Sequence, residues 1–145
     1  MKHRKILLVL LAAGVVLLLG SCDQLMSSLF GVSIEARIDA FEDTLNTEDR
    51  ADILDHLHPE MRNRQQLADP TVIDTSPLGY ANKPFVIGAP EVDDSDVALC
   101  SFQHINASGT IEFTMKREGL DYKILKLKLS LNDGDTILEY KRFWN

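Results

Sequence analysis

The stretch 110–131, TIEFTMKREGLDYKILKLKLSL, decides the fold of this chain. Apolar side chains recur at every second position along both of its halves: Ile111, Phe113 and Met115, then Leu125, Leu127, Leu129 and Leu131. This period of two is typical of strands with one buried and one solvated face. The turn-forming residues 118–121 lie between the halves, so the stretch predicts an antiparallel hairpin. Ile124 next to Leu125 breaks the alternation, and a β-bulge there would restore it.

The same pattern extends on both sides of this hairpin. Residues 97–104 and 136–143 also read as strands, and turn formers at 106–109 and 132–135 separate them from the central pair. Connections this short favour antiparallel neighbours. We therefore expect a meander of about four strands: 97–104, 110–117, 122–131 and 136–143.

The residues before the meander have a helical period instead. Ser33 is a good N-cap, and apolar residues follow it on one helical face: Ile34, Ile38, Phe41 and Leu45. Thr47 can cap a second helix that ends at His58-Pro59, and Pro59 suits the first turn of a third, reaching about Ala68. From 71 to 90, Pro and Gly punctuate the chain around one short apolar run at 85–87.

Two to three helices followed by an antiparallel meander predict an α+β domain with the helices packed on the apolar face of a curved sheet. Over residues 33–145 this order resembles the nuclear transport factor 2-like fold, in which a curved sheet wraps an N-terminal helix to form a cone. The resemblance is one of topology. A cystatin-like domain, with one helix on a four-stranded sheet, is the alternative.

The N-terminus has the pattern of an export signal. Lys2, Arg4 and Lys5 precede an apolar run of 14 residues at 6–19, which is short of the ~20 residues that a membrane-spanning helix needs. Leu19-Gly20-Ser21-Cys22 then resembles the lipobox of bacterial lipoprotein precursors. The resemblance implies cleavage before Cys22 and a lipid on its thiol. We thus expect a signal peptide at 1–21, a lipidated tether at 22–32 and one domain at 33–145, with an uncleaved anchor as the alternative.

Charge excludes one class of partner. Without residues 1–21 the chain keeps 12 basic and 22 acidic side chains, a net charge of −10. Phosphate contacts require a basic surface, so we expect no nucleic acid as a partner. The charge is uneven, since residues 116–145 carry +2 and give the last two strands a locally positive face. That face is a solvated surface or a docking surface for an acidic partner.

No set of residues in this sequence forms a catalytic or metal-binding motif. The positions expected to face inward are apolar, and we expect no cofactor or metal. His104 is the best candidate for an inward polar group because it shares a strand face with Phe102. Cys100 reads as a small buried thiol, and the acidic stretch 91–96 as a solvated loop. The residues expected to line any pocket inside the cone are Phe41, Phe102, His104, Phe113 and Leu127.

These observations favour a non-enzymatic binding or assembly module that is exported and held on a bacterial cell membrane, inner or outer, by lipid at Cys22. Its partner would be a protein or an apolar small ligand. A small enzyme of the isomerase or dehydratase type is the first alternative, because the resembled superfamily includes such enzymes. A structural protein of the cell envelope is the second.

Overall fold

The structure is a computed structural model that describes residues 31–47, 51–69, 77–132 and 137–140. The side chains of 51 and 137–140 are not described. The predicted signal peptide at 1–21, Cys22 and most of the tether at 22–32 lie outside the described residues. Ser33–Asn145 forms one compact unit, separate from Met1–Val32.

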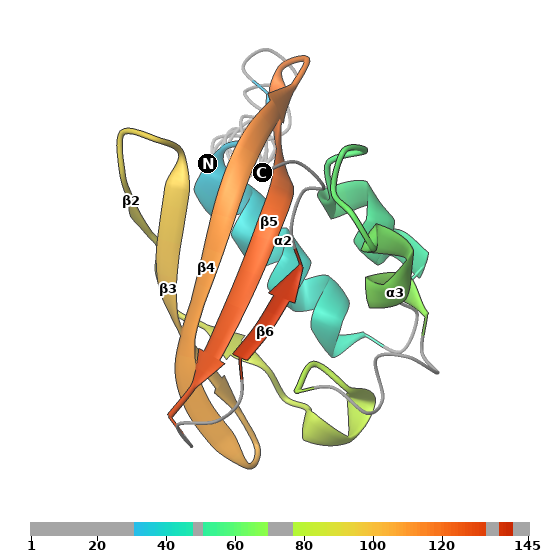
Figure 1. Ribbon diagram of the computed structural model, residues 1–145, viewed down its shortest axis with the longest axis vertical. Helices are drawn as coiled ribbons and strands as arrows, with labels where there is room; N and C mark the ends of the chain where they lie inside the picture. The colour runs from blue at the N-terminus through green and yellow to red at the C-terminus, as the bar shows by residue number, and fades with distance from the viewer. Residues whose placement is uncertain (1–30, 48–50, 70–76, 133–136, 141–145) are drawn as a thin grey trace, which may run out of the picture. The chain divides into compact units, whose positions relative to one another are not determined.

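Six antiparallel strands form one sheet within the described residues (Figure 1). They are β1 (Val86–Ile87), β2 (Glu91–Val92), β3 (Val97–His104), β4 (Ala107–Glu118), β5 (Asp121–Leu131) and β6 (Ile137–Tyr140). The order is β1-β3-β4-β5-β6, and β2 also pairs with β3. The predicted meander is thus present as β3 to β6. Its first strand has the expected bounds, whereas β4 begins three residues early because 107–109 pair with β3 instead of forming a turn.

Two short strands add to the sheet where none was expected. Ile87 pairs with Phe102, and Glu91 pairs with Leu99, so β1 and β2 lie along the same edge of β3. Gly88, Ala89 and Pro90 interrupt this edge, and proline cannot donate to a ladder. Strands of two residues are too short to show an alternating pattern, which explains why the sequence did not reveal them.

One long helix, α2 (Ile34–Asn46), packs against the sheet as predicted. Ser33 caps it, since its Oγ accepts a hydrogen bond from the Ala36 amide at 3.2 Å. The expected second and third helices are shorter than predicted. The second is a 3₁₀ helix, η1 (Ala51–His56), and the third is the five-residue α3 (Arg64–Ala68). A further 3₁₀ turn, η2 (Tyr80–Asn82), precedes β1.

The predicted bulge is present in β5, and it changes which side chain is buried. Thr114 pairs with Lys126 but Met115 pairs with Ile124, so Leu125 is the extra residue. Ile124 is fully buried and Leu125 is half-buried. The expectation that Leu125 shares the buried face was therefore wrong, because the bulge shifts the alternation by one residue.

The turn between β4 and β5 has the expected chemistry. Glu118 pairs with Asp121 across the two-residue loop Gly119-Leu120. Gly119 has φ of +66°, in the left-handed region that favours glycine. Positive φ at the first loop residue is typical of the type II′ turns that join twisted strands.

The core lies between α2, the short helices and the inward face of the sheet. Its largest fully buried side chains are Phe41, Phe85, Phe102 and Phe113. The end of η1 also joins the sheet directly, because Leu57 forms a parallel bridge to Ile124 and the His58 amide donates to the Ile124 carbonyl at 2.8 Å. The molecule is thus an α+β domain with one main helix on an antiparallel sheet.

Candidate functional site

The five residues predicted to line an internal pocket are packed in the core. Phe41 contacts Phe113 edge to face, with ring centroids 5.7 Å apart, and Phe113 pairs across strands with Leu127. Phe102 and His104 form a second group, with centroids 5.9 Å apart. The four apolar side chains are at most 1% exposed. The predicted residues therefore form two aromatic clusters that fill the space between α2 and the sheet.

His104 carries an unsatisfied donor inside the second cluster. Its Nδ1 accepts a hydrogen bond from the Asn106 amide at 3.2 Å, which places the ring proton on Nε2. Nε2 is buried and has no hydrogen-bond partner among the residues that the structure describes. Burial among Phe85 and Phe102 lowers the pKa of His104, so the imidazole is neutral at pH 7. The prediction that His104 is an inward polar group agrees with this position.

A buried polar network joins α2, η1 and β5. Arg37 projects from the buried face of α2 and donates from Nε to the Tyr122 carbonyl at 2.9 Å. Its Nη1 lies 3.2 Å from Nδ1 of His56, and its Nη2 lies 3.7 Å from the Asp121 carboxylate. Nε2 of His56 lies 2.8 Å from Oγ1 of Thr44. Arg37 and His56 are each 8% exposed and are shielded from solvent, whereas the Asp121 side chain is 41% exposed.

The hydrogen bonds fix the protonation of His56. The Thr44 hydroxyl donates its proton to the Ala40 carbonyl at 2.9 Å, so it accepts from Nε2–H of His56. Nδ1 is then an unprotonated acceptor for the Arg37 guanidinium. Burial, and next the Arg37 charge, lower the pKa of His56 to about 4, although Asp55 opposes this. His56 is neutral and both of its ring nitrogens are hydrogen-bonded within the protein, which indicates a structural role in holding η1 against α2.

Sequence reasoning missed this network, although one signal was present. Arg37 lies on the same helical stripe as Ile34, Ile38 and Phe41, where a charge is unexpected. A buried arginine requires partners, which the sequence alone could not place.

Cys100 and the acidic stretch 91–96 have structural roles here. The Cys100 thiol is 2% exposed, and burial with the nearby Asp39 charge raises its pKa to about 11. Asp93 accepts hydrogen bonds from the amides of Ser95 and Val97, at 2.8 and 3.0 Å. Asp96 has φ of +58° and its carboxylate accepts from the Tyr122 hydroxyl. The stretch therefore forms strand β2 and the tight turn before β3, and it is largely exposed to solvent, as expected.

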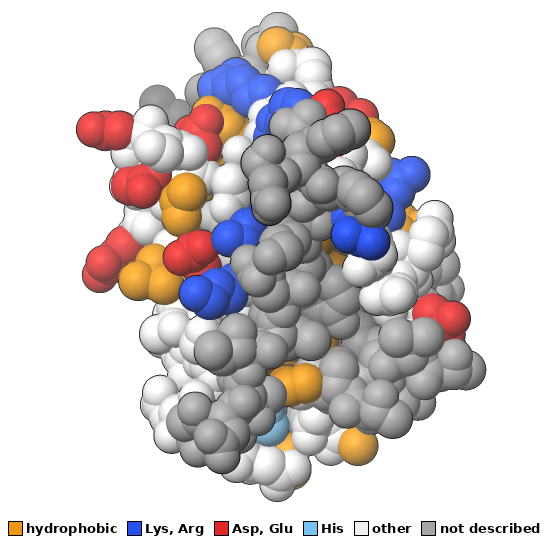
Figure 2. All heavy atoms as spheres, viewed as in Figure 1, with side chains coloured by type: hydrophobic (Ala, Val, Ile, Leu, Met, Phe, Trp, Pro, Cys, Tyr) orange, Lys and Arg blue, Asp and Glu red, His pale blue; other side chains and the backbone are white. Residues whose placement is uncertain are grey.

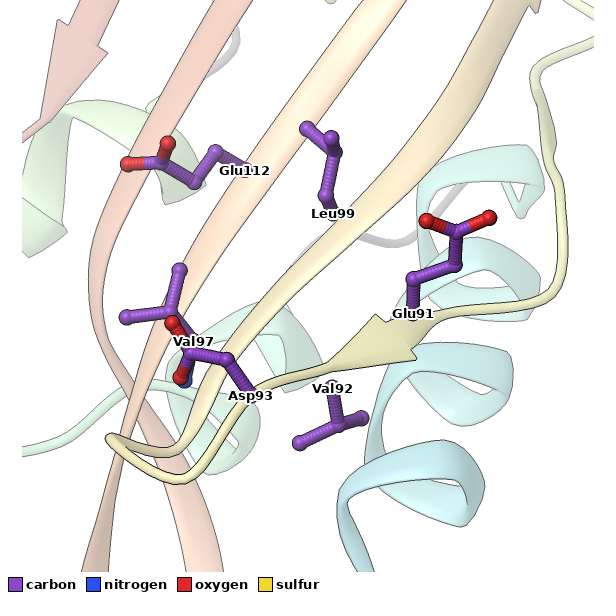
Figure 3. Close-up of a pocket in the computed structure, with 6 residues that line it drawn as sticks. All are labelled: Glu91, Val92, Asp93, Val97, Leu99 and Glu112. Carbon is purple, nitrogen blue, oxygen red and sulfur yellow. The ribbon is translucent and has the colours of Figure 1, made fainter.

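A groove lies on the outer face of the sheet, opposite α2. This shallow groove of about 430 Å³ is lined by Glu91, Val92, Asp93, Val97, Leu99 and Glu112. The side chains of Glu91, Leu99 and Glu112 point to the same side of the sheet, whereas Val92 points the other way (Figure 3). Leu99 is 45% exposed and Val92 is 41% exposed. Aliphatic surface and carboxylates therefore alternate in one open groove.

The outer face carries both signs of charge. Cross-strand pairs place Leu99 beside Glu112 and Glu112 beside Lys128. Acidic and apolar side chains gather over β2 and β3, and basic side chains lie beside them over β4 and β5 (Figure 2). The sequence indicated the basic part of this face. It did not indicate the groove, which depends on the unexpected strand β2.

Comparison of the chain with protein-family models, curated proteins and solved structures finds no match. None of the described helices combines the length and the hydrophobicity needed to cross a bilayer. Among the described side chains, no cluster of His, Cys, Asp and Glu is arranged to hold a metal ion.

Proposed function

We propose that this protein is an exported lipoprotein whose α+β domain binds a partner through the outer face of its sheet and performs no catalysis. One observation carries the proposal: the side chains expected to line an internal pocket are packed in the core, while the outer face has an open groove with exposed aliphatic and acidic side chains. Exposed apolar surface rimmed by polar residues is typical of interaction sites.

The anchoring part of the proposal rests on the N-terminal sequence. A basic start, a short apolar run and Leu19-Gly20-Ser21-Cys22 would direct export and place lipid on Cys22. One acyl chain binds a membrane marginally, but two or more hold a protein stably. The domain would then act outside the cytoplasm, close to the surface of the inner or outer membrane.

We also propose a nuclear transport factor 2-like architecture for residues 33–145. The support is the order of elements, with helices first and a meander afterwards, and the packing of α2 against one face of the sheet. A cystatin-like domain remains the alternative, and the single main helix supports it.

A small enzyme is the second candidate function, and one observation favours it. Nε2 of His104 is a buried donor without a partner in the described part of the chain, as expected of a group that meets a substrate. Against it, Phe85 and Phe102 pack on the ring. Turnover of a substrate that is lost in His104→Phe would support this candidate over the binding role.

Site-specific photo-crosslinking in the native host tests the binding role. A photoreactive amino acid at Thr110, exposed on the outer face of β4, should give an adduct of one defined mass. The same group at Leu120, 59% exposed in the β4–β5 turn, is the control and should give none. The proposal fails if Thr110 gives no adduct or if both positions give the same adducts.

A further inference from the structure

The edge of the sheet beside the groove has backbone groups that are free to pair. The Asp93 amide donates to the Val97 carbonyl at 2.9 Å and the Val97 amide donates to the Asp93 carboxylate, so hydrogen bonds join the two residues directly beyond the pair Val92 and Ala98. Such pairs alternate with pairs that do not exchange hydrogen bonds. Val92, paired with Ala98, is of the second kind, so its N–H and C=O point away from β3. Figure 1 shows β2 at the margin of the sheet, with no described strand beyond it.

The side chains around this edge define the chemistry of an occupant. On the outer face lie three carboxylates, of Glu91, Asp93 and Glu112, next to the aliphatic side chains of Val97 and Leu99. Val92 projects to the opposite face and is 41% exposed. An occupant therefore binds more tightly when it carries cationic groups on long aliphatic stems, which lysine and arginine provide. A small aliphatic group beside Val92 would increase the affinity of this occupant further.

We propose that the β2 edge and the adjacent groove bind an extended basic–aliphatic–basic segment of a partner polypeptide, added to the sheet as a strand; this inference rests on the proposed binding role. The backbone of the middle residue pairs with the N–H and C=O of Val92. Residues directly opposite each other on neighbouring strands point to the same face of a sheet, so the aliphatic side chain of this middle residue lies on the same face as Val92. The two flanking basic side chains lie on the outer face, near Glu91 and Asp93, with their stems toward Leu99.

The size of the groove favours a short segment over a second folded domain. A stable interface buries ~800 Å² on each partner, which six lining residues do not supply. A groove of about 430 Å³ lies at the small end of ligand sites and suits a few side chains. The chain's own basic–aliphatic–basic segment, Lys126-Leu127-Lys128, is already paired between β4 and β6. Another polypeptide must therefore supply the segment.

Titration of the full chain with a defined peptide tests this inference. The probe is the end-blocked peptide GTKVKTG, added to ¹⁵N-labelled protein in micelles of an uncharged detergent and followed by NMR. We expect the Val92 amide signal to move and its hydrogen exchange to slow, because this amide becomes a donor. Affinity should fall as salt is raised, and the acidic peptide GTEVETG should not bind.

Matched variants identify the groups that bind. Leu99→Ser and Glu112→Gln each weaken GTKVKTG binding about fivefold, the change expected for one lost contact or charge pair. Leu120→Ser and Glu35→Gln, exposed positions outside the groove, leave it unchanged. Val92→Pro removes the donor and weakens binding similarly, and NMR spectra verify that each variant is folded.

Two results would overturn the inference: equal binding of the basic and acidic peptides, or unchanged binding in both Leu99→Ser and Val92→Pro. A peptide that does not bind, combined with a defined Thr110 adduct, overturns this inference and leaves the binding role standing. Loss of the adduct overturns the binding role whatever the peptide does.

Discussion

Nδ1 of His56 accepts a hydrogen bond from Nη1 of Arg37 at 3.2 Å, across the contact between α2 and η1. This geometry requires a neutral imidazole, because a proton on Nδ1 would face the guanidinium. Thr44 fixes the other nitrogen, and Arg37 continues to the Tyr122 carbonyl on β5. The hydrogen bond between Arg37 of α2 and His56 of η1 therefore forms only while the imidazole is uncharged.

Stability should depend on the protonation of His56. Its pKa is about 4 in the folded protein and ~6.5 in the unfolded chain, so the unfolded chain takes up the proton first as pH falls. The free energy of unfolding should be highest above pH ~6.5 and should drop between pH ~6.5 and 4 by on the order of 3 kcal/mol. Urea unfolding at a series of pH values measures this.

His56→Gln is the control for that profile. The variant keeps a polar side chain without a titrating ring, so its unfolding free energy should fall less over the same pH range. Burial also lowers the pKa of His104, which therefore contributes to the pH dependence that remains in this variant. If the unfolding free energy depended on pH equally in the wild-type protein and in His56→Gln, His56 would not be the titrating group.

His104→Phe tests the unsatisfied donor in the core. The substitution keeps the ring contacts with Phe85 and Phe102 and removes a buried N–H for which the described residues supply no acceptor. The hydrogen bond lost at Nδ1 comes from the amide of Asn106, an exposed residue in the β3–β4 turn. We expect stability to be unchanged or raised by about 1 kcal/mol in thermal unfolding. A loss above about 2 kcal/mol would show that Nε2 has a bonding partner.

Gly109→Ala tests how closely β4 approaches β5. A Cβ at Gly109 would overlap the Ser130 carbonyl oxygen and lie 2.8 Å from the Leu131 Cα. Backbone atoms cannot move aside cheaply, so we expect a loss of about 2 kcal/mol in urea unfolding. Gly119→Asn is the comparison, because Gly119 has open space around it and asparagine tolerates positive φ. Equal losses would contradict the close approach.

Paired alanine substitutions test the bulge in β5. Ile124 is fully buried opposite Met115, whereas Leu125 is the unpaired residue. Ile124→Ala should cost about 3 kcal/mol of unfolding free energy, and Leu125→Ala about 1 kcal/mol. The reverse order would mean that β5 keeps an unbroken alternation.

The meander and the main helix were predictable because each has a long periodic pattern. Strand β3 has its predicted bounds, and Ser33 caps α2 as expected. Near the bulge, the sequence indicated the irregularity but not which residue it would bury. Local sequence patterns do not specify which of two adjacent apolar residues pairs with the neighbouring strand.

The polar network and the groove needed contacts that are distant in sequence. Arg37 and His56 lie 19 positions apart on different elements, and neither belongs to a motif. The groove exists because β2 pairs with β3 and brings Glu91 beside Leu99. The sequence pattern pointed to the inward face as the place for a site, and the side chains there are packed together in the core.

The claim that this domain works from a membrane tether is tested most directly at Cys22. Mass spectrometry of the protein purified from membranes of the native host should show an N-terminus that begins at Cys22 and carries a diacylglyceryl group, and Cys22→Ala should abolish both. A mature protein that begins at Met1, or that has an unmodified Cys22, would contradict the account.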